Sequence, residues 1–167
     1  VAENESEAPA PVEPIAVITS IAPARIDVQQ RAIQSWIKQG FEVMSLNVQD
    51  EIDRLTADFP GVRFIRAKRN GRKRLGKPYV YVNDMFSALR QCGRRVVGVI
   101  NSDIILRAGE GLNALLNREA KGSLLYGSRV DIDHVNDATG RYYNRGFDLF
   151  FMDRDVIRDM PDNGFML

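Results

Sequence analysis

Three polar residues, Asn101, Ser102 and Asp103, interrupt the apolar stretch VVGVINSDIIL at residues 96–106. The β-branched run before them is typical of a strand that is covered on both faces. A carboxylate placed where such a strand ends is costly to bury unpaired, so it needs a cation, a donor or solvent. Mg²⁺ accepts one or two protein carboxylates and takes its other ligands from substrate phosphates and water. Asp103 alone is therefore enough to bind a nucleoside diphosphate through a metal ion; the alternative is that it caps a turn or the next helix.

Polar residues also end two earlier predicted strands. The strand predicted within 14–23 ends in Thr19 and Ser20, and the strand predicted at 41–48 carries Asn47 near its end. Hydroxyl and amide groups can hydrogen-bond to the edge of a nucleobase and to ribose. A turn with a helix cap explains Thr19 and Ser20 equally well, and a simple turn explains Asn47.

A basic run, RAKRNGRKRLGK at residues 66–77, holds seven basic residues in twelve. Three interpretations stay open: a solvated loop, a patch for nucleic acid or another anionic surface, and a flexible loop that neutralises a diphosphate. Lys77 is the residue expected to point inward, because a helix predicted to begin at Pro78 would offer its N-terminus to an anion. No aromatic residues alternate with these charges, which argues against the stacking of single-stranded bases.

Asp148 lies within the predicted apolar strand GFDLFFM at residues 146–152. Side chains alternate between the two faces of a strand, so Asp148 can face a crevice while its neighbours face the core. Burial would raise its pKa, which suits a general base that deprotonates an acceptor hydroxyl in an inverting transfer. The alternative is an ion pair with Arg145 or another arginine, and a retaining transfer needs no such base.

His134 and Cys92 are the only histidine and cysteine, so the sequence predicts neither a zinc cluster nor a histidine-based catalytic triad. His134 lies close to Asp131 and Asp133 in a polar segment. These residues fit an acceptor pocket, a second metal site or an ordinary surface loop.

Alternating strands and helices position these residues. Besides the strands already named, we expect strands at 62–67 and 123–130. Helices are expected within 25–40, with Asp27 and Gln30 as a capping box, and within 50–60, 78–93, 110–122 and 153–160. Short connections between such elements predict an α/β fold, a three-layer, mostly parallel sheet with helices on both faces. Ligands of such sheets bind at the carboxyl ends of the strands, where the strand order reverses.

Length and composition limit the number of domains and the classes of partner that the chain can have. Its 167 residues, 44% hydrophobic, fit one domain at 15–167, preceded at 1–14 by a Glu, Ala and Pro-rich segment expected to be a disordered linker. The net charge of +1 selects no partner. A single cysteine fits a reducing, cytoplasmic location, and no stretch approaches the roughly 20 apolar residues of a transmembrane helix. The chain starts with Val1 and ends on apolar residues, so we expect the domain to be C-terminally incomplete.

Residues 15–106 resemble the nucleotide-sugar-binding half of GT-A-type glycosyltransferases, the nucleotide-diphospho-sugar transferases. The resemblance rests on the strand ending TS, the segment QQRAIQSW, the strand ending LNV, the segment EIDRL, and GKPYVYVNDMFSAL leading into VVGVINSDI. It implies a GT-A-like fold with a Rossmann-like nucleotide-binding half. The D-x-D motif of that family binds a metal ion and the diphosphate; its final Asp corresponds to Asp103, whereas Asn101 replaces its first Asp.

The resemblance implies a glycosyltransferase that binds a nucleotide-diphosphate sugar with Mn²⁺ or Mg²⁺ at Asp103 and transfers the sugar to an unidentified acceptor hydroxyl. Asp148 is the expected catalytic base. The expected nucleotide-binding residues are Thr19, Ser20, Arg25, Asn47, Lys77, Asn101, Ser102 and Asp103. A catalytically inactive GT-A-like binding module is the alternative that the missing first Asp favours. A nucleic-acid-associated protein that uses the basic run is a third hypothesis, which the composition of the run supports less.

Overall fold

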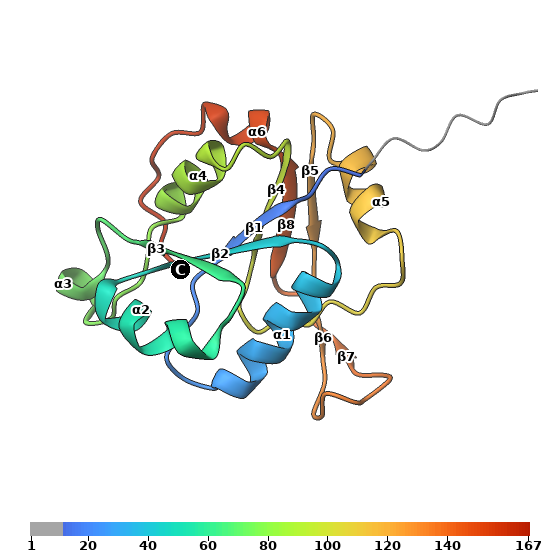
Figure 1. Cartoon of the computed structure of the whole chain (residues 1–167), viewed down its shortest axis with the longest axis horizontal. Coiled ribbons are helices and arrows are strands. Elements are labelled where there is room, and N and C mark those ends of the chain that lie inside the picture. Colours follow the sequence, from blue (N-terminus) through green and yellow to red (C-terminus); the bar gives the residue numbers. More distant parts are fainter. Residues whose placement is uncertain (1–11) are drawn as a thin grey trace, which may run out of the picture.

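The computed structural model describes residues 12–167 and is built on one six-stranded sheet (Figure 1). The strand order is β3-β2-β1-β4-β8-β5. The strands are β1 (Ala16–Thr19), β2 (Glu42–Asn47), β3 (Val62–Arg66), β4 (Val96–Ile100), β5 (Leu124–Gly127) and β8 (Leu149–Asp153). The first four in the sheet are parallel, and β8 runs antiparallel to both β4 and β5. The predicted α/β fold with a mostly parallel sheet is therefore confirmed.

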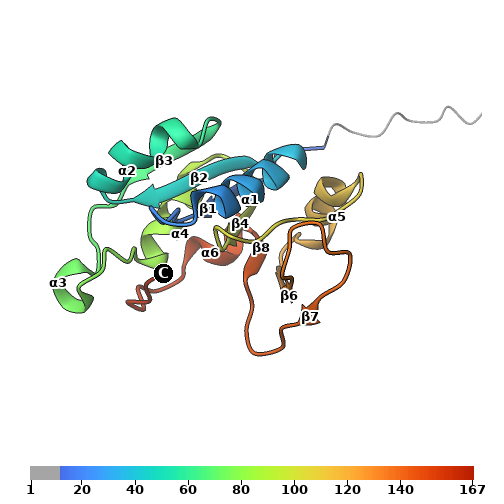
Figure 2. The ribbon, with the colours of Figure 1, turned by 90° about the horizontal axis from the view of Figure 1, so that it is seen from below.

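Helices cover both faces of the sheet (Figures 1 and 2). The helices α1 (Ile26–Lys38), α2 (Gln49–Leu55) and α5 (Leu112–Glu119) lie on one face, with the short 3-10 helix η1 (Thr56–Asp58) following α2. The helices α4 (Val82–Gln91) and α6 (Arg154–Arg158) lie on the other. A small hairpin of β6 (Val130–Asp131) and β7 (Arg141–Tyr142) stands beside the sheet. None of the helices described in residues 12–167 is long and apolar enough to cross a membrane.

Alternation along the strands divides the apolar residues between two cores. Val17 of β1 packs with Trp36 of α1 and Leu116 of α5, whereas Ile18 packs with Met85 of α4 and Ile157 of α6. All of β4 is buried, as its continuous β-branched sequence predicts. The sheet therefore fixes the carboxyl ends of β1, β2 and β4 at one edge, where the polar residues were expected.

Two local predictions are wrong. No capping box forms, because α1 begins after Arg25, which has left-handed backbone angles, and Asp27 lies inside the helix without capping it. The predicted helix at Pro78 does not form either: α4 begins at Val82, and a four-residue helix, α3 (Arg72–Leu75), forms inside the basic run instead. The cause lies in the C-terminal segment, since Val80 and Leu167 exchange two backbone hydrogen bonds of 2.9 and 2.8 Å. This pairing holds the chain before α4 extended.

Residues 1–11 of the predicted linker lie outside the described residues. Residues 12–14 are exposed and belong to no helix or strand, and Ile15 is the first buried residue.

Candidate functional site

A cavity of about 610 Å³ opens where the strand order reverses, between the ends of β1 and β4. We call it the switch-point pocket. Crevices at this position of an α/β sheet are where ligands bind, because the connections leave the two strands in opposite directions. Seven of the predicted nucleotide-binding residues line it: Thr19, Ser20, Arg25, Lys77, Asn101, Ser102 and Asp103. Residues that are far apart in the sequence are thus brought to one site.

Asn47 is the predicted nucleotide-binding residue that does not line the pocket. It is fully buried, and its amide Nδ2 donates to the Ile21 carbonyl at 2.8 Å and to Glu51 Oε2 at 2.9 Å. Its Oδ1 accepts from the Ser45 hydroxyl at 2.6 Å. Ser45 Oγ in turn accepts from the Ile21 backbone N–H at 3.0 Å. The end of β2 therefore holds the loop after β1 and orients Glu51, and the structure gives Asn47 no direct access to a ligand.

Two buried polar residues at the pocket were missed in the sequence, Gln29 and Glu51. They are 3% and 6% exposed, and both line the pocket. Gln29 Oε1 accepts from the Ala22 N–H at 2.9 Å, while its Nε2 donates to the carbonyls of Ala22 and Ala24 at 2.8 and 2.5 Å. Gln29 thereby fixes the loop between β1 and α1. The available signal was a polar residue on the buried face of a predicted helix.

Arg25 joins the loop to a second cavity. Its φ of 50° is the only positive φ of a non-glycine residue in the part of the chain that the structure describes. A left-handed backbone conformation is uncommon for residues other than glycine, and it occurs more often at functional sites than elsewhere. The arginine is exposed and lines both the switch-point pocket and the neighbouring cavity. The positively charged side chain of Arg25 therefore lies at the junction of the two cavities.

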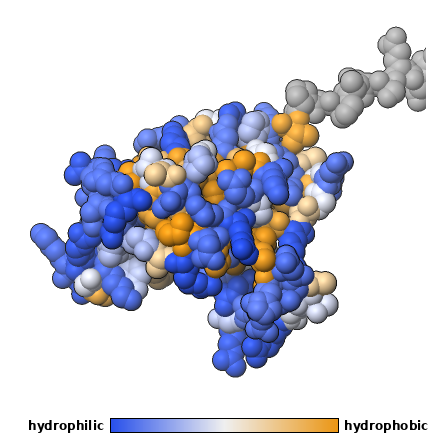
Figure 3. All heavy atoms as spheres, turned by 60° about the horizontal axis from the view of Figure 1, so that its bottom comes forward, coloured by the Kyte–Doolittle hydropathy of each residue, from blue (hydrophilic) through white to orange (hydrophobic). Residues whose placement is uncertain are grey.

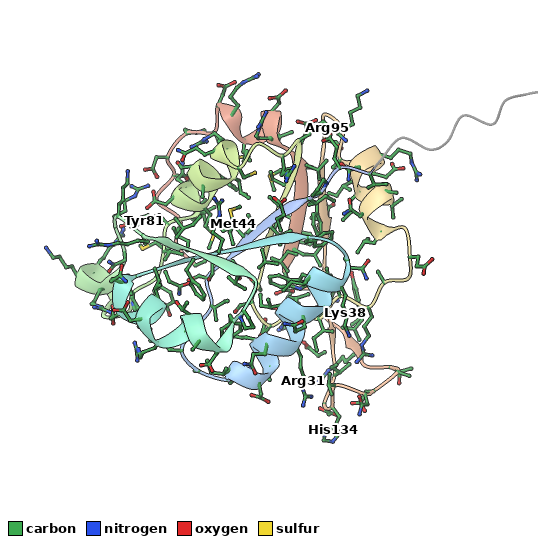
Figure 4. The ribbon with its side chains drawn as sticks, in the orientation of Figure 1. Arg31, Lys38, Met44, Tyr81, Arg95 and His134 are labelled. Carbon is green, nitrogen blue, oxygen red and sulfur yellow. The ribbon has the colours of Figure 1, made fainter. Side chains whose placement is uncertain are left out.

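The second cavity, about 1180 Å³, lies between the start of α1, the chain after β4 and the hairpin of β6 and β7. Arg31 on α1 and His134 in the hairpin mark its two sides (Figure 4). In the space-filling view, the hydrophilic hairpin projects from the body of the molecule, and apolar residues are visible in the middle of that face (Figure 3). We call this cavity the hairpin pocket. His134, Asp131 and Asp133 line it and are exposed.

Asp103 lines both pockets and is exposed. Among residues 12–167 it forms no ion pair. The segment that follows it is anchored on α1, because Trp36 Nε1 donates to the Ile104 carbonyl at 2.7 Å and Ser35 Oγ accepts from the Leu106 N–H at 2.9 Å. These bonds fix the backbone that follows Asp103, while the Asp103 carboxylate stays open to solvent.

Asp148 lies just before β8, is 6% exposed and lines the hairpin pocket. Its Oδ1 accepts from Asn101 Nδ2 at 2.9 Å and from Arg129 Nη1 at 2.8 Å. The ion pair that competed with a catalytic role therefore exists, but with Arg129 rather than Arg145. The other oxygen, Oδ2, is buried and has no hydrogen-bond partner among the described residues.

Arg129 connects this carboxylate to the hairpin. Its Nε donates to Asp131 Oδ1 at 2.7 Å, and its guanidinium lies 4.0 Å from the centre of the Tyr143 ring. The hydrogen bond to Asp131 raises the pKa of Arg129 most; desolvation opposes the rise and Asp148 adds to it. Arg129 is thus a permanent cation, and it fixes Asp148 and the hairpin relative to each other.

The oxygen donors at this junction fit a hard divalent cation. Asp103 supplies an exposed carboxylate that lines both pockets. Oxygen ligands are what Mg²⁺ prefers, and it commonly binds through one or two carboxylates and substrate phosphates. No cluster of three or more His, Cys, Asp or Glu side chains suited to a metal occurs within residues 12–167. The phosphates of a substrate would therefore have to complete the coordination.

Lys77 is exposed and lines the switch-point pocket, with its ammonium 5.9 Å from the centre of the Tyr79 ring. Two other members of the basic run are paired with acids. Arg69 bonds Asp84 at 3.0 Å and Asp162 at 2.7 Å, and Arg72 bonds Asp50 at 2.9 Å. Part of the charge of the run is thus neutralised within the molecule.

The sequence matches no protein-family model and no curated protein. Its structure, however, is similar to solved structures. One is the 4-diphosphocytidyl-2C-methyl-D-erythritol synthase from Anaerococcus prevotii DSM 20548, with a TM-score of 0.54 and 11% identity over 85% of this chain and 71% of that chain. Another is the bifunctional IspDF from Campylobacter jejuni, with a TM-score of 0.53 and 6% identity over 90% of this chain. The match covers 44% of the bifunctional protein, so this chain spans less than half of its length.

At these identities the similarity establishes the fold. The chain is an α/β protein with a Rossmann-like, mostly parallel sheet of the kind found in these two enzymes. Fold and function are separable, so the function has to be argued from the site.

Proposed function

We propose that this chain is the nucleotide-binding part of a transferase and that the switch-point pocket binds a nucleotide-diphosphate sugar. The single observation that carries the proposal is that seven polar or charged residues line this one pocket; they come from the end of β1 and the loop after it, the segment after β4 and the segment before α4. The Anaerococcus protein is named for a diphosphocytidyl product, which supports a nucleoside and a diphosphate as ligands that this fold can bind.

Each group has a role that its chemistry suits. The hydroxyls of Thr19 and Ser20, at the end of β1, can bond ribose. Lys77 and Arg25 can offset the charge of the diphosphate, and Asp103, with Asn101 and Ser102 beside it, would hold Mn²⁺ or Mg²⁺. The bound ion would offset the negative charge that develops on the departing diphosphate.

Glycosyl transfer is the finer proposal. Asp103 lines both pockets, so a diphosphate bound beside it would direct the attached sugar toward the hairpin pocket, which has room for an acceptor. The bond between the anomeric carbon and the diphosphate oxygen breaks, and the acceptor oxygen bonds to that carbon. The acceptor proton passes to a base. Asp148 Oδ2, which has no described partner, is the group proposed to accept it.

Calorimetric titration with UDP, GDP and CDP, with and without Mn²⁺ or Mg²⁺, tests the binding proposal. We expect affinity that depends on the metal ion and that falls at least about tenfold in Asp103→Ala, since a charged interaction is lost. Asp58→Ala is the matched control, because Asp58 is an exposed carboxylate outside both pockets. If no nucleotide produces heat with the wild-type protein, the proposal is wrong.

Product analysis tests the finer proposal. Incubation with nucleotide-diphosphate sugars and water as a weak acceptor should release nucleoside diphosphate and free sugar. Incubation with nucleoside triphosphates should release no pyrophosphate. Release of pyrophosphate instead would identify nucleotidyl transfer, and the glycosyl proposal would be abandoned.

A binding module without catalysis is the second candidate. The observation that favours it is the pair of hydrogen bonds that Asp148 Oδ1 accepts from Asn101 Nδ2 and Arg129 Nη1, which commit this oxygen to partners within the protein. Equal nucleotide affinity of wild type and Asp103→Ala, with no effect of metal ions and no turnover, would support this candidate.

A further inference from the structure

Glu51 is a buried carboxylate at a pocket where no described cation neutralises it. It belongs to the first turn of α2, is 6% exposed and lines the switch-point pocket. Within residues 12–167 it forms no ion pair, and Asn47 is the one side chain that bonds its carboxylate. Burying a carboxylate without a cation is unfavourable, so a ligand that donates hydrogen bonds to Glu51 would be favoured at this place in the pocket. Donors from a ligand would compensate its charge.

The surroundings fix the orientation of this carboxylate. Both amide hydrogens of Asn47 are used, one for Glu51 Oε2 and one for the Ile21 carbonyl, and Ser45 fixes the other end of the amide. No described residue bonds Glu51 Oε1 through its side chain. The network therefore presents a preorganised acceptor to the pocket, which lowers the entropic cost of binding a ligand.

The order of the strands places Glu51 away from the phosphate end of the pocket. Glu51 follows β2, Asp103 follows β4, and β1 lies between them. Two strand spacings separate β2 from β4, about 10 Å. With the diphosphate at Asp103 and ribose at Thr19 and Ser20 of β1, the nucleobase lies toward Glu51.

A carboxylate accepts hydrogen bonds and donates none when it is ionised. Guanine presents two adjacent donors, N1–H and the N2 amino group, which match the two oxygens or two lone pairs of one carboxylate. Uracil presents one N–H between two carbonyl oxygens, and cytosine and adenine each place a ring-nitrogen acceptor beside their amino group. Those acceptors would lie against the negative charge of Glu51.

We propose that Glu51 selects the base and that the nucleotide bound in the switch-point pocket is a guanosine diphosphate derivative. This inference rests on the proposed function, since it assigns the base of the nucleotide that the same pocket would bind. Glu51 is a specificity residue that Asn47 orients, and the polar end of β2 thus acts on the ligand indirectly.

Calorimetric titration with GDP, IDP, UDP, CDP and ADP in the presence of Mg²⁺ tests the assignment. IDP is guanosine diphosphate without the N2 amino group and is the matched ligand. For the wild-type protein we expect GDP to bind roughly tenfold or more tightly than IDP, because one hydrogen bond to a charged group is lost. UDP, CDP and ADP should bind more weakly still.

Glu51→Gln is the test variant. Its amide can still accept from Asn47 while presenting a donor to the pocket, so the preference for GDP over IDP should disappear. Asp58→Asn is the matched control and should keep that preference. Circular dichroism melting verifies that both variants fold, and the comparison of two ligands within one variant is independent of any loss of stability.

The outcomes separate the two proposals. Tighter binding of UDP, or equal binding of GDP and IDP, overturns the assignment of guanine and leaves nucleotide binding in place. An equal loss of affinity for all five nucleotides in Glu51→Gln would mean that Glu51 holds ribose, which also overturns it. Absence of binding by every nucleotide refutes the proposed function together with this inference.

Discussion

Asn101 shows how one amide changes the chemistry of a strand end. In the resemblance to GT-A-type glycosyltransferases it replaces an aspartate. In the structure its Nδ2 donates to Asp148 Oδ1, a bond that a carboxylate could not make. The backbone repeats the pairing, with the Asn101 N–H donating to the Asp148 carbonyl at 2.9 Å. Asn101 and Asp148 are thus a matched pair, and the single charge of Asp148 is balanced by Arg129.

Replacing Asn101 by aspartate would place two carboxylates about one hydrogen-bond length apart. We expect the free energy of unfolding at pH 7 to fall by about 1–3 kcal/mol, because a donor is lost and like charges repel.

Urea denaturation of the wild type and Asn101→Asp at pH 7 measures this effect. Asn163→Asp is the control, because Asn163 is exposed and its Oδ1 accepts from the Phe165 N–H, a role that aspartate keeps. An Asn101→Asp variant as stable as the wild type would contradict the proposed loss of a donor and repulsion.

At the scale of elements, side chains that bond backbone groups hold the ends of strands and helices. Asp153 ends β8 and begins α6, where its Oδ1 accepts from the Asp155 N–H at 3.0 Å. Its Oδ2 accepts from the Gly122 N–H at 3.1 Å, and Arg95 lies 3.7 Å away. One carboxylate therefore joins the start of α6 to the turn between α5 and β5.

The pKa of Asp153 lies below its ordinary value of 3.8. Burial alone would raise it, but the backbone donors of Asp155 and Gly122 and the charge of Arg95 together outweigh burial. A group with a lowered folded-state pKa contributes stability above its unfolded pKa and loses that contribution as the pH falls through its folded pKa. Asp153 therefore stabilises the fold at neutral pH and contributes progressively less in acid.

Asp153→Asn keeps a cap that can accept a hydrogen bond but removes the charge. We expect it to lower the free energy of unfolding at pH 7 by about 1 kcal/mol. The difference from wild type should narrow as the pH falls below 3.8, because the unfolded chain binds a proton at this carboxyl before the folded protein does. Denaturation across pH 7 to pH 3 measures this; Asp155→Asn, an exposed change in the same helix, should show a smaller effect. A constant difference would contradict the charge-based explanation.

At the scale of the molecule, periodicity predicted the sheet because each strand and helix has its own apolar pattern. The buried run at 96–100 became β4, and the polar ends of β1 and β4 meet at one pocket, as adjacent parallel strands require. What the pattern could not show depends on contacts distant in sequence. Val80 is extended because it pairs with Leu167, and Asn47 is buried because its amide bonds Ile21 and Glu51.

The partner of Asp148 was hidden in the sequence for the same reason. An ion pair with Arg145 or another arginine was one of two interpretations of Asp148, but the sequence could not show which arginine, because Arg129 lies 19 positions away and reaches Asp148 through the pairing of β5 with β8. Glu51 lies within the helix predicted at 50–60, but the sequence does not show that it is buried, because exposure on a helix is decided by what packs against it. The locations of site residues were thus predictable from strand ends, whereas their partners were not.

The two parts of the sheet meet where parallel β4 pairs with antiparallel β8, and Gly98 sits at the centre of this junction opposite Phe151. A Cβ added at Gly98 would lie 2.9 Å from the backbone oxygen of Phe150 and 2.9 Å from the Phe151 ring. The backbone oxygen cannot rotate away, so the strands would have to separate. Gly98→Ala should therefore destabilise the whole molecule by about 1–3 kcal/mol.

Because β4 also carries Asn101 to Asp103 at its end, the loss should appear as one cooperative thermal transition at a lower temperature, shifted by roughly 2–4 °C for each kcal/mol. Calorimetry measures it. Gly109→Ala is the control, since a Cβ there meets no atom within 4 Å. Equal transition temperatures for the two variants would show that β4 and β8 can move apart without cost. A separate early transition would show that the parallel and antiparallel parts unfold independently, contrary to the single folded unit that the continuous sheet implies.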